Sequence, residues 1–372
     1  MAGEKPVKIV VTGGHHTPAL AVMAALKKRG NFEFHFIGRA TSLRSEKTTS
    51  VEKRTMEKLG IPFYNLKTGK LYKSGVGELV KIPGGFLQAF WLLMRIRPRL
   101  IVSFGGYLAA PVMLAGFFLR IPRVTHEQTV VSGWANRFSA YLANKIFVSW
   151  EPSRKFFPKD KTVLTGNPLR EEIFNPKGKK IIVSRDLPTV YITGGKQGSH
   201  LINEVVRVSL SQFLENYNLI HQTGSSASQD YQKLILLKNQ LPKALKKRYL
   251  VQEYFGEEEI GAVLAATDAV VGRSGANTVT EIAAKGLPSV LIPIPWVSHN
   301  EQEENAKILS ERGAALIISQ DKLSAPDLLL ALAQIFSHYK EFKKHAEEAR
   351  SLIKPNAAER IASEILAMLD LS

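Results

Sequence analysis

The amino-acid sequence predicts an α/β protein made of two Rossmann-like domains. Short runs of β-branched and apolar residues alternate with helix-length segments along the chain, a pattern typical of a mostly parallel sheet. A glycine-rich turn follows the first strand of each half, at Gly13-Gly14 and at Gly194–Gly198. The length of 372 residues also favours two domains, because a single hydrophobic core usually stops growing at about 250 to 300 residues.

The first half contains five predicted strands. A strand over residues 8–12 leads through the glycine-rich turn into a helix over 18–28, and a second strand over 33–37 follows directly. The remaining strands, separated by helix-length segments, cover 100–103, 123–126 and 145–149. Asn167-Pro168 favours a turn and an extended chain, so we place the first domain at residues 1–166.

The alternation restarts after this boundary and predicts a second domain over residues 167–356. Its strands cover 189–193, 218–222, 249–252, 269–271, 289–292 and 314–317. The last residues, 357–372, form an amphipathic helix, and we expect this helix to pack back on the first domain.

Composition narrows the class of protein. The chain has no cysteine, which excludes disulfides, thiolate catalysis, zinc–thiolate sites and iron–sulfur clusters. Residues 1–166 hold 26 Lys and Arg against 9 Asp and Glu, which accounts for the whole net charge of +17. This asymmetry points to an anionic partner, nucleic acid or a membrane surface, with a solvated basic face as the alternative. The start enters a strand without an apolar signal segment, which predicts a cytoplasmic protein.

The strongest functional signal lies where the strand 269–271 breaks at Gly272 and becomes a helix. Such a junction leaves backbone N–H groups unpaired at the helix start, where the macrodipole also favours a phosphate. Glu281 lies three residues after Thr278 on the same helical face and can accept two ribose hydroxyls. The alternative is a helix capped by Thr278 or Ser274, with Glu281 completing a capping box from Thr278. The candidate nucleotide-binding residues here are Arg273, Ser274, Gly275, Ala276, Asn277, Thr278 and Glu281.

The turn after the first strand places glycines where the backbone must approach a ligand closely. It contains Thr12, Gly13 and Gly14 and matches neither the dinucleotide-binding GxGxxG motif nor a Walker A loop. His15 follows and is a candidate general base or oxyanion donor. A histidine that only caps the turn is the alternative.

A second polar cluster in the first half follows the strands 100–103 and 123–126. The carboxyl ends of strands face the ligand crevice in doubly wound sheets, so Glu127 is another candidate base. His126 and Glu127 are sequence neighbours, which is poor spacing for metal ligands, and we assign no metal. A glycine-rich strand end, Gly105-Gly106-Tyr107, precedes this cluster, and the residues expected to join Glu127 are Asn136 and Arg170.

The polar stretch 299–306 follows the strand 289–292 and Pro293. Its carboxamides and carboxylates, including Gln302 and Asn305, suit the hydroxyls of a sugar. A solvated polar helix start is the alternative.

Two apolar segments of the first half carry arginines at their ends. One contains Phe86, Phe90 and Trp91, and the other runs over 114–120. Both are too short and too charged to span a bilayer. They are either ordinary helices packed on the sheet or helices at a membrane interface, and the charge asymmetry favours the interface for the outer face of at least one.

The order and spacing of these segments resemble the MurG glycosyltransferases over nearly the full length. The matching motifs are Thr12-Gly13-Gly14-His15 with Pro18–Val22, Gly105-Gly106-Tyr107, His126-Glu127-Gln128, Gly166–Arg170, Gly194–Gly198, Arg273-Ser274-Gly275-Ala276, and Gln302 with Asn305-Ala306.

The resemblance implies two Rossmann-like domains that face each other across a cleft, the GT-B glycosyltransferase fold. It implies an inverting N-acetylglucosaminyltransferase that moves the sugar from UDP-N-acetylglucosamine to the C4 hydroxyl of the muramoyl sugar of lipid I, giving lipid II in peptidoglycan synthesis. No cofactor or metal would be required. The protein would act peripherally at the cytoplasmic face of the plasma membrane, where it serves cell-wall biogenesis, cell shape and cell division.

The resemblance also implies roles for individual residues. Glu281 would bind the ribose, the Phe255 backbone the uracil, Arg170 the diphosphate and Gln302 the sugar hydroxyls. The other donor residues would be Lys196, Gln197, Arg273, Ser274, Gly275, Ala276, Asn277, Thr278 and Asn305. The undecaprenyl-diphosphate-linked acceptor would meet Thr12, Gly13, Gly14, His15, Gly105, Gly106, Tyr107, Glu127 and Asn136. Phe86, Phe90 and Trp91 would meet an anionic membrane surface.

Three departures from the family pattern bear on activity. Val10-Val11 replaces two glycines before Thr12, Thr129 replaces an asparagine, and Lys196 replaces a serine. We expect Lys196 to compensate as a point charge on a donor phosphate. The catalytic base stays open between His15 and Glu127.

Two other functions stay open at this point. A different GT-B transferase acting on diacylglycerol or another polyprenyl phosphate fits the same basic, apolar first domain. A nucleic-acid-binding protein fits the charge, but the chain lacks aromatic-basic RNA motifs, so we expect no nucleic-acid partner.

Overall fold

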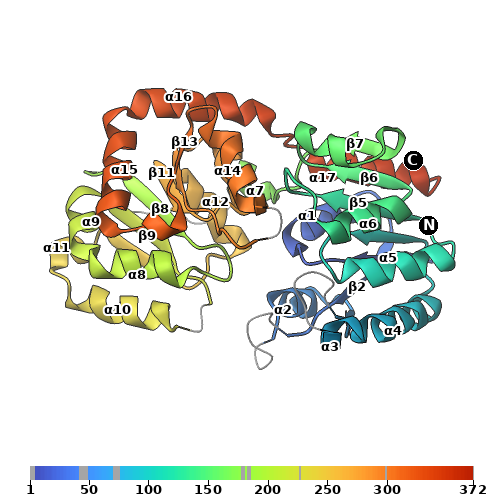
Figure 1. The fold of residues 1–372 in the computed structure, drawn as a ribbon. Coiled ribbons are helices and arrows are strands. Elements are labelled where there is room, and N and C mark those ends of the chain that lie inside the picture. The colour runs from blue at the N-terminus through green and yellow to red at the C-terminus, as the bar shows by residue number, and fades with distance from the viewer. Residues whose placement is uncertain are drawn as a thin grey trace. The chain divides into compact units, whose positions relative to one another are not determined.

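The computed structural model describes residues 5–41, 49–69, 76–176, 181, 186–225, 228–297 and 300–371. The chain divides into two compact units, one of residues 1–168 and 356–372 and the other of residues 169–355. The first boundary therefore follows Pro168 rather than Gly166. Each unit contains one parallel sheet with helices packed around it (Figure 1).

The first unit is built on a seven-stranded sheet with the strand order β3-β2-β1-β4-β5-β6-β7. Its strands are β1 (Val7–Thr12), β2 (Phe32–Gly38), β3 (Phe63–Asn65), β4 (Leu100–Ser103), β5 (Arg123–Glu127), β6 (Lys145–Val148) and β7 (Thr162–Leu164). Its helices are α1 (His16–Lys27), α2 (Val51–Lys58), α3 (Val76–Leu79), α4 (Lys81–Ile96), α5 (Ala109–Phe118), α6 (Trp134–Leu142), the short η1 (Glu151–Phe156) and η2 (Lys159–Lys161), and α17 (Ala357–Met368).

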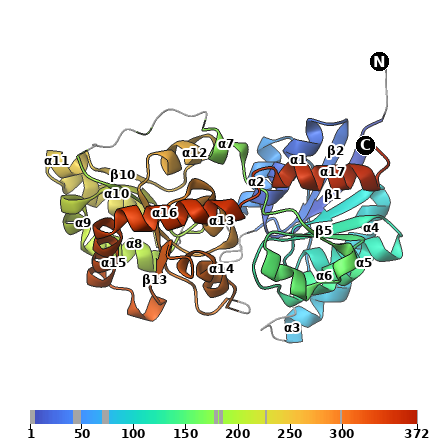
Figure 2. The same ribbon diagram turned by 90° about the horizontal axis from the view of Figure 1, so that it is seen from above.

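Two hydrophobic clusters cover the faces of the first sheet. Helices α1, α2 and α17 pack together on one face, through side chains such as Met23, Met56 and Ile361. Helices α4, α5 and α6 pack on the other face, through side chains such as Leu93 and Val112. Helix α17 lies against α1 (Figure 2), so the last helix of the chain completes the core of the first unit.

The second unit is built on a six-stranded sheet with the strand order β10-β9-β8-β11-β12-β13. Its strands are β8 (Thr189–Thr193), β9 (Asn218–Gln222), β10 (Tyr249–Gln252), β11 (Ala269–Gly272), β12 (Ser289–Leu291) and β13 (Ala315–Ile317). Its helices are α7 (Glu171–Phe174), α8 (His200–Val208), α9 (Leu210–Asn216), α10 (Asp230–Gln240), α11 (Lys243–Lys246), α12 (Glu257–Ala265), α13 (Ala276–Lys285), α14 (Glu301–Ser310), α15 (Ala325–Ser337), α16 (Tyr339–Ala349), and the short η4 (Gln320–Lys322) and η5 (Arg350–Leu352).

Every strand predicted from the sequence is present, and the structure adds β3 and β7 at the two edges of the first sheet. Both are only 3 residues long, too short for an alternation of apolar and polar residues to be visible. Helix α1 begins at His16 rather than Pro18, and β5 extends to Glu127.

Candidate active site

Helix α13 of the second unit begins directly after β11, as the sequence predicts. Its N-cap is Gly275, which has no side chain to cap the helix, and the first intrahelical bond runs from Val279 N–H to Gly275 O. Thr278 is the third helical residue, so the alternative of a capping box from Thr278 to Glu281 is wrong. Ser274 Oγ is buried and finds no hydrogen-bond partner among the described residues. The first-turn amides at this helix start suit a phosphate.

Glu281 and Arg170 form a buried ion pair in the second unit. Arg170 Nη2 lies 3.2 Å from Glu281 Oε1, and the two side chains are only 9% and 14% exposed. Arg170 sits at the N-cap of α7 and Glu281 in the second turn of α13. Two side chains that lie 111 residues apart in the sequence therefore meet beside the helix start. This arrangement brings together a cation and a carboxylate, groups that can bind a phosphate and a diol.

Arg273, a predicted donor-binding residue, has its guanidinium bonded within the second unit. Its guanidinium is buried and donates to Ile292 O at 3.0 Å, Ser199 Oγ at 2.8 Å and Gln320 Oε1 at 2.7 Å. These bonds connect the end of β12, the N-cap of α8 and η4. The side chain thus makes its hydrogen bonds within the protein, and we interpret Arg273 as a residue that stabilises the turn.

The two predicted donor-binding residues of α14 bond to the loops that follow β11 and β12. Asn305 is buried and donates Nδ2 to Ser274 O at 3.2 Å, so it fixes the turn. Gln302 accepts the Ile294 N–H at Oε1 with a distance of 3.1 Å, and its Nε2 has no hydrogen bond within the described residues. Among these residues, Gln302 keeps a donor for a sugar hydroxyl, whereas His299 of the same stretch lies outside them.

The glycine-rich turn 194–198 requires its glycines. Gly195 and Gly198 have positive φ angles of 77° and 73°, and a Cβ on Gly198 would lie 2.1 Å from Thr223 O. Lys196 Nζ lies 5.9 Å from the centroid of the Tyr254 ring, while Gln197 is exposed. The turn therefore presents a cation and backbone amides in front of α8.

Gln222 is a residue that sequence reasoning missed. It ends β9, donates Nε2 to Thr193 Oγ1 at 3.1 Å, and accepts the Phe255 N–H at Oε1 with a distance of 3.0 Å. Because Gln222 accepts the Phe255 N–H, the backbone carbonyl of Phe255 is the group left for the predicted uracil contact. The available signal was a carboxamide at the carboxyl end of a buried strand.

In the first unit, the glycine-rich turns after β1 and β4 touch each other. Gly14 N–H donates to Gly105 O at 3.2 Å, and a Cβ on Gly13 would lie 2.8 Å from the same oxygen. Gly105 and Gly106 have positive φ angles of 70° and 81°. Tyr107 accepts a hydrogen bond from Arg39 at 3.4 Å. The neighbouring strands β1 and β4 thus bring these predicted acceptor residues together. The Thr12 hydroxyl, at the end of β1, donates to Ile37 O.

Hydrogen bonds from Thr129, Ser132 and Asn136 hold Glu127 at the carboxyl end of β5. Oε1 accepts the Thr129 N–H at 3.0 Å and the Thr129 hydroxyl at 2.8 Å, and Oε2 accepts Asn136 Nδ2 at 2.7 Å. Burial raises the pKa of Glu127, and these bonds oppose that rise. Thr129, which departs from the family asparagine, therefore gives its N–H to the carboxylate and shares its hydroxyl proton between Glu127 Oε1 and Val131 O.

His15 occupies the N-cap position of α1, but its side chain makes no capping hydrogen bond. The alternative of a turn-capping histidine is therefore wrong for this ring. Burial lowers the pKa of His15 to about 4, so the imidazole is neutral at pH 7 and able to accept a proton. His126 also has a pKa lowered to about 4 by burial, and its Nε2 lies 3.2 Å from Gly166 O.

The predicted membrane residues divide between the core and the surface. Phe86 and Phe90 are half-buried and pack 6.0 Å apart, centroid to centroid. Trp91 is 56% exposed, and the Arg95 guanidinium lies 5.4 Å from its ring. No described helix has the length and apolar character needed to cross a membrane.

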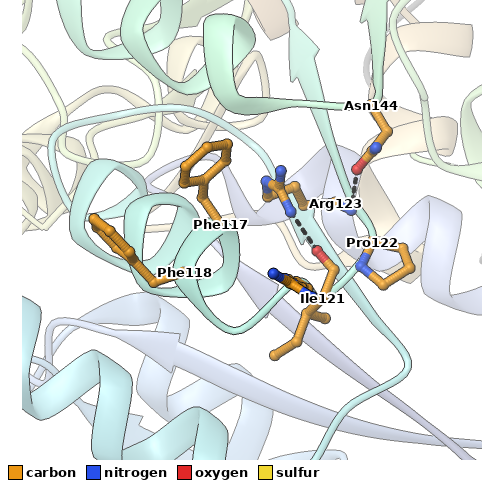
Figure 3. Close-up of a pocket in the computed structure, with 7 residues that line it drawn as sticks. Phe117, Phe118, Ile121, Pro122, Arg123 and Asn144 are labelled. Carbon is orange, nitrogen blue, oxygen red and sulfur yellow. Dashed lines mark hydrogen bonds between the residues drawn. The ribbon is translucent and has the colours of Figure 1, made fainter.

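An open pocket of about 570 Å³ lies beside this surface at the end of α5 (Figure 3). The exposed rings of Phe117 and Phe118 line it. The Arg123 guanidinium lies 5.1 Å from the Phe117 ring and donates to Ile121 O at 2.6 Å. The outer face of α4 and α5 thus combines exposed aromatics with arginines, the composition of a membrane interface.

Two family models match the chain. The glycosyltransferase family 28 N-terminal domain matches residues 9–148, and the family 28 C-terminal domain matches residues 189–362. The chain is 33% identical over 365 residues to a UDP-N-acetylglucosamine--N-acetylmuramyl-(pentapeptide) pyrophosphoryl-undecaprenol N-acetylglucosamine transferase of Bacillus subtilis, covering 95% of this chain and 96% of the relative. A relative of the same description from Halalkalibacterium halodurans is 33% identical over 369 residues, covering 95% and 98%.

Solved structures agree with these matches. The crystal structure of Acinetobacter baumannii MurG superposes with a TM-score of 0.71 at 26% identity and covers 97% of this chain and 100% of its own. The glycosyltransferase CalG4 superposes with a TM-score of 0.67 at 14% identity, covering 99% of each chain, and shows the shared fold alone.

Proposed function

The chain belongs to the MurG family of glycosyltransferases, and on that basis we propose that it transfers N-acetylglucosamine from UDP-N-acetylglucosamine to the C4 hydroxyl of the muramoyl sugar of lipid I. The observation that carries the proposal is the buried Arg170–Glu281 pair beside the start of α13. A nucleoside diphosphate has both the anion and the diol that this pair and the helix start would bind. UDP-N-acetylglucosamine is the donor, and no cofactor is part of the proposal.

The reaction is a direct displacement with inversion. The acceptor C4 oxygen attacks the anomeric carbon, the bond from that carbon to the UDP oxygen breaks, and the acceptor proton passes to a base. The leaving diphosphate receives charge stabilisation from the α13 start at Thr278, from Arg170 and from Lys196. The diphosphate of the acceptor lies against the glycine-rich turns of the first unit.

We assign the base to His15 and a positioning role to Glu127. The His15 imidazole is neutral and uncommitted to capping, whereas both oxygens of Glu127 already accept hydrogen bonds. We expect His15→Ala to lower kcat by about 10²- to 10⁴-fold, the range for loss of a general base, with little change in the KM for the donor. A larger loss of kcat in Glu127→Gln than in His15→Ala would reverse the assignment.

The assay for the reaction is UDP release from UDP-N-acetylglucosamine with and without a lipid I analogue. Release that depends on the analogue and is slower with UDP-glucose and UDP-galactose is the expected result. Absence of acceptor-dependent release refutes the function. Diacylglycerol and a polyprenyl phosphate serve as alternative acceptors, and release with either of these alone assigns the chain to a different lipid substrate.

We further propose that the first unit rests on the anionic cytoplasmic face of the plasma membrane, where the product serves cell-wall synthesis, cell shape and division. Trp91 with Arg95, and Phe117 with Phe118, form the membrane-facing surface. Trp91→Ser should weaken binding to vesicles that contain phosphatidylglycerol. Trp296→Ser is the matched control, because Trp296 is 66% exposed on the second unit. Equal binding by both variants, or binding to a short DNA duplex in place of vesicles, would refute this surface.

A further inference from the structure

A buried chain of polar side chains lies behind the glycine-rich turn of the second unit. Tyr249 OH lies 2.9 Å from His221 Nδ1, and His221 Nε2 lies 3.0 Å from Asn203 Oδ1. Asn203 Nδ2 donates to Asp230 Oδ2 at 2.8 Å, and Asp230 Oδ1 lies 2.8 Å from His200 Nδ1. This row of hydrogen-bonded side chains therefore connects β10, β9, α8 and α10.

The chemistry of the groups fixes the direction of every bond in this chain. The Asp230 carboxylate only accepts, so Asn203 Nδ2 and His200 Nδ1 are both donors to it. Asn203 Oδ1 must then accept from His221 Nε2–H, and the remaining His221 Nδ1 accepts from the Tyr249 hydroxyl. This requires a neutral His221, in agreement with its pKa, which burial lowers to about 3.

The network is buried everywhere except at His200. Asn203, His221, Asp230 and Tyr249 are buried, while the His200 side chain is 52% exposed. A buried carboxylate is costly unless its hydrogen bonds are made. The Asp230 charge thus holds the first residue of α8 and the first residue of α10 against each other.

The same network touches the turn 194–198 through the loop after β9. Asn203 Nδ2 also donates to Thr223 O at 3.0 Å, and Thr223 O is the atom that packs directly on Gly198. Ser225 N–H donates to Lys196 O at 3.3 Å. Movement of Asn203 would therefore shift both the turn and the start of α8 that follows it.

We propose that Asp230, with Asn203 and His200, is a positioning residue that holds the turn 194–198 in the geometry that binds the donor diphosphate. The inference rests on the proposed function, because the diphosphate is the ligand that this turn would bind. It adds residues that do not touch the donor and act through the turn.

The test compares Asp230→Asn with a matched control, Asp268→Asn. Asp268 Oδ2 accepts the Thr189 N–H at 2.8 Å, so it is a carboxylate at the opposite, amino end of the same sheet. Asp230→Asn should raise the KM for UDP-N-acetylglucosamine and the Kd for UDP about tenfold, the effect of about one hydrogen bond to a charged group. The kcat should stay within about twofold, and Asp268→Asn should change neither constant.

Variants of His200 distinguish positioning from a general loss of stability. His200→Gln keeps a side-chain donor for Asp230 and should retain the wild-type Kd for UDP, measured by calorimetry. His200→Leu removes the donor at an exposed position and should weaken UDP binding. If Asp230→Asn does not fold, His200→Leu is the variant that tests the inference. Equal UDP affinity in the wild type, Asp230→Asn and His200→Leu would overturn this inference but not the proposed function. Absence of UDP binding in the wild type overturns it together with the proposed function.

Discussion

The Arg170–Glu281 pair allows a double-mutant cycle that separates its part in stability from its part in binding. The single changes are Glu281→Gln and Arg170→Met, and the third variant carries both. Removal of one partner leaves the other buried, since the side chains are 9% and 14% exposed. Breaking such a pair costs roughly 3 to 5 kcal/mol, and we expect the lower end because Arg170 keeps another interaction.

The cycle also predicts a coupling between the two residues. The double variant should lose about 1 to 3 kcal/mol less than the sum of the single losses, because neither charge is then left alone. A Glu281→Ala variant that lost UDP binding would therefore not prove a ribose contact by itself, because the local structure of α7 and α13 is weakened too.

Hydrogen exchange followed by mass spectrometry measures these losses within the second unit. Peptides from β8, β11 and α13 report the opening free energy of that unit, and peptides from β1 and β4 give an internal reference from the first unit. UDP affinity is measured in parallel by calorimetry, and Glu281→Gln should weaken it about 100-fold, as expected for two lost charged hydrogen bonds.

A coupling within about 0.5 kcal/mol of zero would refute the ion pair, since independent sites add to that accuracy. Unchanged UDP affinity in Glu281→Gln would refute the ribose contact whatever the coupling. The ion pair and the ribose contact can therefore be refuted independently of each other.

Thr129→Val removes the hydroxyl that lies 2.8 Å from Glu127 Oε1, a contact that lowers the pKa of Glu127. Glu127 should then take up a proton at higher pH, and because a protonated Glu127 loses its positioning hydrogen bonds, we expect kcat to begin to fall on the acid side at higher pH than in the wild type. Thr129→Asn, which restores a donor, is the control, and an unchanged pH dependence of kcat in Thr129→Val would contradict the contact. Acid should also destabilise the first unit, since the pKa of His126 is lowered to about 4. The unfolded chain binds this proton below about pH 6.5, so the free energy of unfolding should fall by roughly 3 kcal/mol between pH 6.5 and 4. Trp150, which is buried and donates to Gln128 O, reports urea unfolding by fluorescence, and a His126→Gln variant that kept the full pH slope would contradict the assignment.

The sequence predicts the central strands of both sheets and the turns at their ends because both depend on local patterns. Buried parallel strands read as continuous apolar runs, as in Ala269–Val271 and Leu100–Val102. The glycines of the turns are needed for positive φ or close backbone approach, as at Gly198 and Gly105, and this requirement is visible in sequence.

The partners of long polar side chains could not be predicted in the same way. Arg273 lies in the right turn, but its guanidinium reaches Ser199 and Gln320, which are distant in sequence. Thr278 looks like a cap only if the helix starts there, whereas the helix starts at Ala276 with Gly275 as its N-cap. Such contacts depend on tertiary placement of several elements, and no spacing along the chain encodes them.

The return of α17 to the first unit has a consequence for biosynthesis. The ribosome makes residues 1–168 first, yet Ile361, Ala362 and Ile365 belong to the same hydrophobic cluster as α1. The second unit is synthesised in full before these residues emerge. The first unit therefore lacks the cover of α17 on α1 until residues 357–368 are made, and we expect this apolar face to be prone to aggregation during that time.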